Sequence, residues 1–515
     1  MSRKRKRHIQ VSEAPSTRDQ SDDKRNHCIP SELVYLVLIC ALSFRLIGLG
    51  GALPHILHPD EPFIVDHAIS ILKTGDANPH WFIYPDLYIY LNVVIGWVIR
   101  SFGVDFWGHY TGGRCIYGNE PLASMYFLGR FTTACFGVAT ILATFISTRK
   151  LFGRDAAMLV AMAIGVSASH IEHSHYLTTD VPAAFFVALC LCFALHERWA
   201  LSGVAAGLAA ATKYNAGLSV ILPIGLILAR WRGGHSFRDC VVTCGACGLS
   251  FLIVMPWIFI EPTGVMAALR QTSITYSSDF LGIDGTFNWL WYVKVLFLES
   301  PAIFCMIAMG WVAAFKRDPR RIGAMLAFPI LYWILIGSLR IRVFRSFIPI
   351  LPVVLVGFGG ITGWLSRLGN GVRVVLLTIA FGTSLIWAGQ WSLARAIPDS
   401  RALSFKWINE HLPRGARILS EHYCPPVLRD RFRAEFAPNL SDIDPTLLAK
   451  PEIEYVITSS YCYKRYFDEP ERGRLAITRY QSIFDTWTLI ATFEPGSNLK
   501  GPIIKIYRRP GLDHR

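Results

Sequence analysis

The chain has 515 residues, of which 52% are hydrophobic and only 17% are charged, and its mean hydropathy is +0.36. A water-soluble domain could not keep this balance in solution, so the composition excludes an ordinary soluble protein and predicts one that resides in lipid. The net charge of +14 is spread unevenly. Five basic residues stand together at the start, and most of the others fall in short gaps between apolar runs.

The basic run at residues 3–7 precedes the first apolar stretch, residues 33–49. Such a run can bind nucleic acid, but in front of an apolar stretch it is more often a topology signal that keeps the N-terminus in the cytoplasm. We therefore expect residues 1–30 to form a basic cytoplasmic tail, with no nucleic-acid partner. No small-residue cleavage site follows the apolar stretch, so we expect a retained helix and not a signal peptide.

Eleven apolar segments are interpreted as membrane-spanning helices. In chain order they are residues 33–49, 122–147, 156–169, 181–195, 201–211, 217–229, 241–260, 290–315, 322–336, 347–365 and 374–391. One further segment, residues 87–99, has about 13 residues against the roughly 20 that a span needs. Counting it as a span would put the basic gap at 149–154 outside the cell. We therefore expect an in-plane or re-entrant helix within a long external loop, residues 52–120.

With this assignment every basic gap lies in the cytoplasm, as the positive-inside trend requires. The gaps are residues 149–154, 230–238, 316–321 and 367–373. The predicted fold class is an all-α polytopic membrane protein of about eleven helices over residues 31–395. The charged segment that follows predicts a small extracytoplasmic α/β domain over residues 396–515.

In this C-terminal domain, helix-like runs at 402–412 and 469–483 alternate with strand-like runs. The strand-like runs are residues 417–421, 453–459, 489–493 and 503–507. Cys424 and Cys462 could form a disulfide if the domain lies outside the cell. The closely spaced Cys240, Cys244 and Cys247 sit in an apolar segment with no fourth ligand, so packing is the favoured interpretation.

Polar residues gather first after the first predicted span. His58 precedes the adjacent acids Asp60 and Glu61, and a polar and aromatic loop with His80 and Tyr84 follows close behind. Helix capping would explain one acid, with Pro62 in the first turn, but not an adjacent pair preceded by a histidine. The loop is of the kind that forms the floor of a binding site.

A second polar group lies at residues 172–180 and includes His173, His175 and Asp180. Asp180 stands before a Val-Pro step, where an N-cap is the structural alternative to a catalytic role, and the two are compatible.

A third group is cationic. It comprises Lys213 and, just before an apolar run, Arg340, Arg342 and Arg345.

These cations fall on the predicted outer side, against the positive-inside trend. A bound anion would explain this, and the alternatives are contact with lipid headgroups or pairing with the acids. Arg45 and Arg130 lie within predicted helices, where a charge usually faces a polar interior. The acids and cations together predict a polar site at the outer membrane surface.

The ordered series of motifs resembles the GT-C membrane glycosyltransferases. It is most similar to bacterial relatives of the dolichyl-phosphate-mannose protein mannosyltransferases and of the aminoarabinose lipid A transferases. The resemblance covers residues 33–365 and rests on the acidic pair and on residues 78–81, 84–88, 179–182, 212–215 and 345–352. Residues 100–120 match nothing in either relative, which leaves the acceptor open.

The resemblance implies transfer of a sugar from a polyprenyl phosphate carrier to a lipid, polysaccharide or protein acceptor, usually with inversion. Such chemistry needs a base for the acceptor's proton and cations for the phosphate. By motif position Asp60 is the base with Glu61 in support, and Asp180 is the third catalytic residue. The implied substrate-binding residues are His58, His80, Tyr84, His175, Lys213 and Arg345.

A divalent cation, Mg²⁺ or Mn²⁺, is a further option that the resemblance leaves open, with Asp60, Glu61, Asp180 and His173 as its ligands. The implied location is a cell membrane, here a bacterial inner membrane, which the chain crosses several times.

The same helices and external charges could also belong to a lipid or solute transporter or flippase, with Asp60 and Asp180 as coupling-ion ligands. We see no internal repeat, and the charges lie on one side of the predicted membrane. Because alternating access normally needs a polar site near the membrane centre, the sequence favours the transferase.

Overall fold

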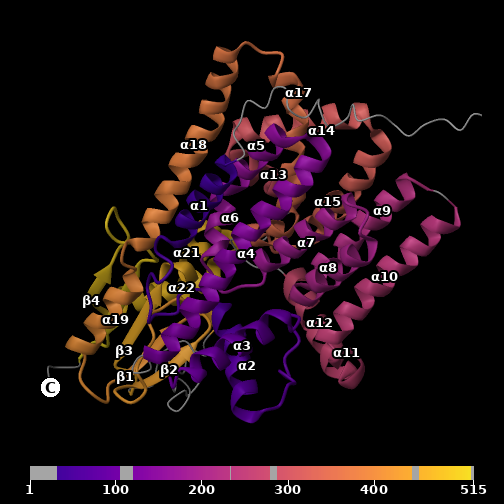
Figure 1. Ribbon diagram of the computed structural model, residues 1–515. Helices are drawn as coiled ribbons and strands as arrows, with labels where there is room; N and C mark the ends of the chain where they lie inside the picture. Colours follow the sequence, from indigo (N-terminus) through magenta and orange to yellow (C-terminus); the bar gives the residue numbers. More distant parts are fainter. Residues whose placement is uncertain (1–31, 105–119, 232, 279–286, 443–451, 512–515) are drawn as a thin grey trace, which may run out of the picture.

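The computed structural model describes residues 32–104, 120–231, 233–278, 287–442 and 452–511. Helices fill most of the molecule, and a small sheet lies at one end, at the lower left of Figure 1. Five helices are long and apolar enough to cross a membrane, or up to seven spans if each of two bent pairs counts as one. The protein is therefore a mostly helical, multi-pass membrane protein, as its composition predicts.

The first half of the helical region contains α1 to α9, and most of them follow the predicted apolar runs. Their bounds are α1 Leu33–Leu46, α2 Glu61–Thr74, α3 Leu87–Ser101, α4 Glu120–Phe152, α5 Arg154–Gly165, α6 Ala168–Ser174, α7 Asp180–Leu195, α8 Trp199–Thr212, the 3-10 helix η2 Tyr214–Val220, and α9 Ile221–Ala229. The segment predicted at 156–169 is a bent pair, α5 and α6, with 59° between its parts. The bend lies at Ser167, whose side chain caps α6 by accepting a hydrogen bond from the His170 N–H.

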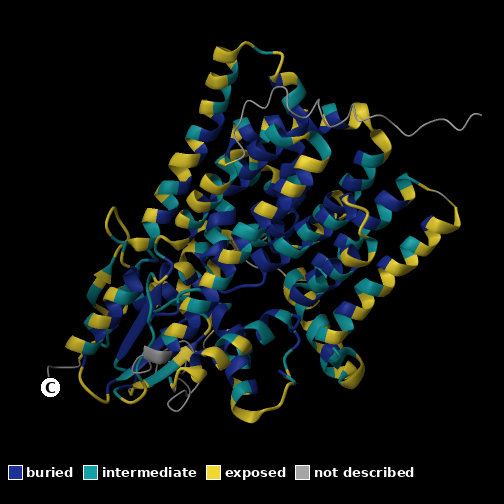
Figure 2. Cartoon of the chain, in the orientation of Figure 1, coloured by how far each residue is buried: buried dark blue, intermediate teal, exposed yellow. Residues whose placement is uncertain are grey.

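The second half runs from α10 to α18. The bounds are α10 Gly234–Val254, α11 Trp257–Ile260, α12 Pro262–Ser277, α13 Asn288–Glu299, α14 Pro301–Arg317, α15 Pro319–Ser338, η3 Phe344–Ile350, α16 Leu351–Val356, η4 Gly357–Ile361, α17 Thr362–Leu365 and α18 Asn370–Ala396. Figure 2 shows exposed residues along α10 and α18 at the edge of the bundle, while its centre is buried.

Two predicted spans differ in detail from the helices observed, and a proline explains each. The segment at 290–315 is not one helix, because α13 and α14 meet at an angle of 116°. Ser300 precedes Pro301, and a residue before proline is driven out of the helical conformation. The segment at 241–260 ends early, at Val254, because Met255 precedes Pro256.

The C-terminal region is a five-stranded sheet in the order β2-β1-β3-β5-β4. The strands are β1 Arg417–Glu421, β2 Arg433–Ala437, β3 Tyr455–Ser459, β4 Thr488–Phe493 and β5 Ile504–Arg508. β1 pairs in parallel with β2 and β3, and β5 is antiparallel to β3 and β4. All four predicted strands are present; β2 was not predicted.

Helices cover both faces of this sheet: α19 (Ser400–His411) on one, and α21 (Ser460–Asp468) with α22 (Pro470–Thr486) on the other. Neighbouring strand residues point to opposite faces, so Ile418 packs toward α19 and Leu419 toward α22. The suggested disulfide is not formed, because Cys424 and Cys462 are both free.

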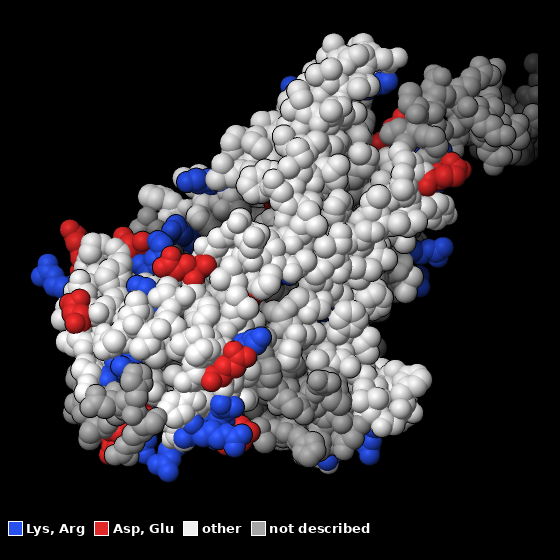
Figure 3. Space-filling view, turned by 90° about the vertical axis from the view of Figure 1, so that its left-hand side faces the viewer, with Lys and Arg blue, Asp and Glu red and all other residues white. Residues whose placement is uncertain are grey.

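The sheet, α2 and α3 all lie at the lower end of the molecule in Figure 1, and the turn between α17 and α18 lies at the upper end. Figure 3 shows charged residues gathered over the lower part of one face and a broad uncharged area above them. The first predicted polar group, at the start of α2 and in the loop before α3, therefore lies at the end of the molecule that holds the sheet.

Candidate active site

Asp60 stands at the N-terminus of α2, where it could cap the helix. Its backbone is already helical, with φ −92° and ψ −19°, and its side chain makes no cap hydrogen bond. The carboxylate instead forms an ion pair with Arg345 of η3, and the Tyr84 hydroxyl donates to it over 3.3 Å. Among the described residues, both contacts fall on Oδ2, so Oδ1 is the oxygen available to receive a proton.

His58 supports Asp60 as a neutral group. The Asp60 N–H donates to His58 Nδ1 over 3.2 Å, which assigns the ring proton to Nε2. Burial, followed by the charge of Arg345, holds the pKa of His58 well below its ordinary value. The ring packs on Tyr176 with 4.2 Å between centroids. A neutral histidine here adds no positive charge that would compete with Arg345 for Asp60.

Asp180 and Lys213 form a second ion pair, with 2.5 Å between Nζ and Oδ1. Lys213 reaches Asp180 because the chain is extended at this residue, between the end of α8 and η2. Asp180 is the first residue of α7, and the N-cap position that was its structural alternative is taken by Thr179. Burial, followed by the nearby Tyr276 and the charge of Asp180, raises the pKa of Tyr84. Tyr84 donates to Asp60 and therefore lies near both acids.

Glu61 is placed differently from its neighbour. Both of its oxygens accept hydrogen bonds from Arg130 of α4, each at 2.7 Å, and the Leu177 N–H donates to Oε1 over 3.0 Å. The Glu61 side chain is fully buried, and that of Arg130 is 6% exposed. With three hydrogen bonds on its two oxygens, Glu61 holds α2 against α4 and has little capacity left to accept a substrate proton.

The remaining predicted histidines do not all join this site. His175 places both ring nitrogens against main-chain carbonyls, those of Ile171 at 2.8 Å and Ile47 at 3.0 Å, so it ties α6 to the loop after α1. His173 lies close enough to Asp180 for their charges to interact.

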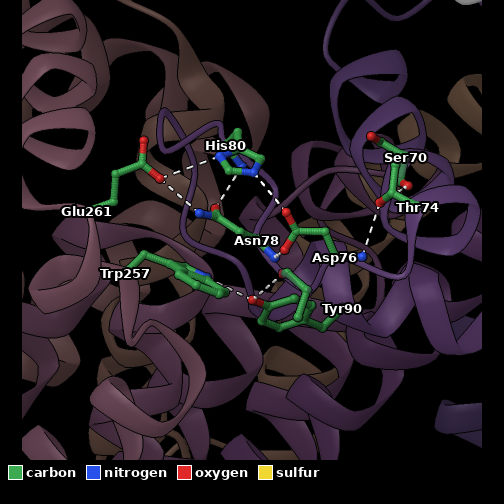
Figure 4. A network of polar contacts seen from close by, with 9 residues as sticks. Ser70, Thr74, Asp76, Asn78, His80, Tyr90, Trp257 and Glu261 are labelled. Atoms are coloured by element: carbon green, nitrogen blue, oxygen red, sulfur yellow. Dashed lines mark hydrogen bonds and ion pairs between the residues drawn. The ribbon is translucent and has the colours of Figure 1, made fainter.

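Figure 4 shows that His80 belongs to a separate network. Its ring contacts Asp76 at 3.0 Å and Glu261 at 3.5 Å, and Asn78 donates to Glu261 over 2.8 Å. The hydrogen bond that the His80 ring donates to the Asp76 carboxylate raises the pKa of His80. This network ties the loop between α2 and α3 to the start of α12, away from the two ion pairs.

Of the other arginines singled out in the sequence, Arg45, Arg340 and Arg342 make contacts away from Asp60. Arg342 lies over the Trp291 ring at 5.9 Å, and the Arg340 N–H donates to the Tyr276 carbonyl. Arg45 is fully buried and donates to Ser174, which confirms that an intrahelical arginine faces a polar interior here. Of the three cations before the apolar run, Arg345 is the one that reaches Asp60.

The predicted metal ligands do not fit a metal ion in this arrangement. Within the described ranges no group of three or more His, Cys, Asp or Glu residues is placed to hold one. Asp60, Glu61 and Asp180 are each paired with a cationic side chain instead. No step of the chemistry is therefore assigned to a metal.

Sequence reasoning missed one group of residues entirely. Arg395, Arg401 and Lys500 line a cavity of about 550 Å³ between the helical region and the sheet. His58 and Pro59 also line it, so the cavity reaches the residue next to Asp60. Only the charge of the C-terminal segment could have suggested these cations, because their position depends on how that region docks.

The fold and the charge pairs define a class: this chain has the fold of the GT-C membrane glycosyltransferases. A family model described as dolichyl-phosphate-mannose-protein mannosyltransferase matches residues 123–260. Dolichyl-phosphooligosaccharide-protein glycotransferase 2 of Pyrococcus furiosus is 26% identical over 240 residues. That match covers 45% of this chain but only 29% of the archaeal relative.

Among solved structures, ArnT from Cupriavidus metallidurans bound to undecaprenyl phosphate has a TM-score of 0.54 and 14% identity. The match covers 93% of this chain and 98% of ArnT. The Archaeoglobus fulgidus oligosaccharyltransferase, in complex with Zn and sulfate, has a TM-score of 0.55 and 12% identity, over 91% of this chain and 73% of that one. The predicted resemblance to GT-C glycosyltransferases is thereby confirmed.

Proposed function

We propose that this protein transfers a sugar from a polyprenyl phosphate carrier to an acceptor on the extracytoplasmic side of a cell membrane. The observation that carries the proposal is the ion pair between Asp60 and Arg345, which places a carboxylate and a phosphate-binding cation side by side. The structures of two similar folds support it, since one was solved with undecaprenyl phosphate and another with dolichol-phosphate.

In the proposed reaction Asp60 takes the proton from the acceptor's nucleophilic oxygen. That oxygen attacks the anomeric carbon while the bond from this carbon to the carrier phosphate breaks, so the configuration inverts. The polyprenyl phosphate leaves with the electron pair, and Arg345 and Lys213 stabilise its charge. Asp180 holds Lys213 in position, and Tyr84 orients Asp60.

Donor binding would also activate the base. In the structure Arg345 neutralises Asp60, which favours the carboxylate form but weakens its attraction for a proton. A phosphate that draws the guanidinium toward itself leaves Asp60 more basic. The base would thus reach full strength only when the donor is present.

The isoprenoid chain of the carrier has an apolar place close to Arg345. A groove of about 230 Å³ is lined by Phe347 and Ile350 of η3, by Val354 of α16, and by Trp311 and Trp333. Phe347 and Ile350 lie in the same 3-10 helix as Arg345, so a phosphate at Arg345 would place its lipid tail beside this groove.

We further propose the topology on which this function depends. Residues 31–395 would cross the membrane about eleven times, with shorter helices such as α7 and α8 counted as spans, and with α3 lying in the plane of the outer surface. Residues 396–515 would form the extracytoplasmic domain. The acceptor could be a lipid, a glycan or a protein.

The test is transfer by purified protein in detergent from a radiolabelled polyprenyl phosphate sugar, with Arg345 as the probe residue. Arg345→Lys should raise the apparent donor KM about 10-fold and Arg345→Ala about 100-fold or more, because lysine cannot reproduce the two charge-assisted hydrogen bonds of a guanidinium. Arg373→Lys, near the start of α18 and away from the proposed site, is the matched control. Equal donor KM in all four proteins would refute the phosphate role, and absence of transfer by the wild type would refute the function.

A further inference from the structure

The cavity of about 550 Å³ has walls from four parts of the chain. Gly48 to His58 precede α2, Tyr176 follows α6, Trp391 and Arg395 end α18, and Tyr461 and Lys500 come from the C-terminal region. Figure 1 shows the lower end of α18 beside the sheet, where these parts meet. A cavity of this size accommodates one or two sugar rings, within the range of known ligand sites.

The cavity is lined by four cationic side chains and two acidic ones, so its lining carries excess positive charge. The cations are Arg130, Arg395, Arg401 and Lys500, and the acids are Glu172 and Asp399. Three of the cations have partners that hold them. Arg130 binds Glu61, Arg401 binds both oxygens of Asp399 at 2.8 and 3.0 Å, and Lys500 donates to the carbonyls of Ala394 and Arg395.

Arg395 is the exception. Its guanidinium lies over the Tyr176 ring at 4.2 Å and near the Trp391 ring at 5.5 Å, which fixes its plane. Its Nε and Nη2 atoms are buried, yet neither has a hydrogen-bond partner among the described residues. Glu172 is an acidic group close enough to feel the Arg395 charge, and the Tyr176 hydroxyl lies within hydrogen-bond reach of the guanidinium. A buried donor edge without an acceptor costs free energy that a bound anion would recover.

The walls indicate what carries the anion. Four aromatic side chains, Tyr176, Trp391, Tyr423 and Tyr461, line the cavity. Flat apolar rings pack well against the C–H face of a sugar, and their hydroxyl and N–H groups can bond its hydroxyls. His58 and Pro59 form the wall next to Asp60, so a sugar held here would point toward the base.

We propose that this cavity is the acceptor subsite and that it binds an acidic saccharide, a sugar that bears a phosphate or a carboxylate, with Arg395 as the residue that selects the charge. The assignment as acceptor subsite rests on the proposed function; the binding site itself does not. The carrier phosphate is assigned elsewhere, to Arg345 and the apolar groove beside η3, so the two substrates approach Asp60 from different sides.

The experiment measures binding to the full-length protein in detergent by saturation-transfer NMR, with no donor present. The probes are mannose 6-phosphate, glucuronate, mannose and inorganic phosphate. The wild type should bind at least one acidic sugar about 10- to 100-fold more tightly than mannose or inorganic phosphate. Arg395→Gln should abolish that preference, and Arg373→Gln, the same change at the other end of α18, should retain it.

Comparing mannose 6-phosphate with glucuronate shows whether the site prefers a phosphate or a carboxylate. Equal binding of mannose and both acidic sugars, or an unchanged preference in Arg395→Gln, would overturn the proposal. Tight binding of inorganic phosphate alone would show a simple anion site and would also overturn it. A short-chain polyprenyl phosphate that competes with the acidic sugar would instead assign the cavity to the donor. This experiment measures binding and not transfer, so the two proposals can fail separately. If the protein binds an acidic sugar here but shows no transfer in the assay described above, the proposed function is refuted and the binding site stands.

Discussion

Asp60 and Glu61 are neighbours in the chain, but their surroundings give them different chemistry. Asp60 is 14% exposed and shares one oxygen between Arg345 and Tyr84. Glu61 is fully buried and uses both oxygens on Arg130. A partly exposed carboxylate with a free oxygen can exchange a proton with a substrate. A buried one with three hydrogen bonds on its two oxygens has little capacity left to do so.

Asp60→Asn should therefore lower the rate of transfer by about 10²- to 10⁴-fold, the usual contribution of a general base, while the protein keeps its fold. Asparagine retains the shape of the side chain and can still accept from Tyr84. The measurement is kcat of the purified variant beside its thermal unfolding midpoint. A kcat near the wild-type value would show that Asp60 only holds Arg345.

The control for this change is Asp468→Asn. Asp468 lies at the end of α21 and pairs with Lys464 on the surface of the C-terminal region. Loss of an exposed pair should cost at most about 1 kcal/mol of stability and leave kcat unchanged.

At the scale of elements, the Glu61–Arg130 pair joins the start of α2 to the middle of α4. Arg130 also donates to the Leu49 carbonyl, so the pair fixes the loop between α1 and α2 as well. The loop that carries Asp60 is thus positioned by a buried contact directly beside it.

Glu61→Gln should destabilise the protein by about 3–5 kcal/mol, because it leaves the Arg130 charge buried without compensation. Thermal unfolding in detergent measures this. Glu410→Gln, which removes an exposed partner of Lys406, is the matched control and should cost under about 1 kcal/mol. The double variant Glu61→Leu/Arg130→Met should recover part of the loss; a single variant as stable as the wild type would contradict the structural role.

A second element-scale prediction concerns Asp86, at the start of α3. It is fully buried, and neither carboxylate oxygen has a hydrogen-bond partner within the described ranges. Burial raises the pKa of Asp86 from 3.8 to about 7, although Trp257 opposes the shift. Since the folded state then holds its proton more tightly than the unfolded state, the free energy of unfolding falls as pH rises from about 4 to 7 and stays low above that.

Asp86→Asn should therefore raise the unfolding midpoint at pH 8 by a few degrees, and the gain should shrink toward pH 5. Asparagine is neutral throughout, so it lacks the cost of a buried charge. Midpoints of wild type and variant at both pH values test this, with exposed Asp430→Asn as the control. A gain that is equal at pH 5 and pH 8 would contradict the titration.

At the scale of the whole molecule, the polar residues divide between two ends. α2, α3 and the sheet share the lower end in Figure 1, and Figure 3 shows charges gathered there below an uncharged area. A bilayer around the uncharged area would leave the two ends in different compartments.

We expect single cysteines at positions 76 and 429 to react with an impermeant maleimide on intact cells, in a background without the native cysteines. A cysteine at position 373, in the turn region at the opposite end, should react only after permeabilisation. Labelling of 76 and 373 under the same conditions would contradict the proposed orientation.

Much of the fold could be read from the sequence, because the signals for it are local. Apolar runs determined where most of the helices form, and alternating runs located four of the five strands. The prolines at 256 and 301 were also visible, yet their effect on two spans was missed because length and hydropathy do not record a bend. β2 was missed because Arg433–Ala437 is short and charged, and only pairing with β1 makes it a strand.

The sequence by itself determined that the protein resides in lipid, that its C-terminal region is α/β, and that acids and cations gather in the polar loops. Only the tertiary structure decided how those charges combine: Asp60 with Arg345, Glu61 with Arg130, and Arg395 in a cavity that needs the sheet docked against α18. The physical reason is range. Hydropathy and helix signals act over a few residues, whereas an ion pair between residues far apart in the chain depends on how every intervening helix packs.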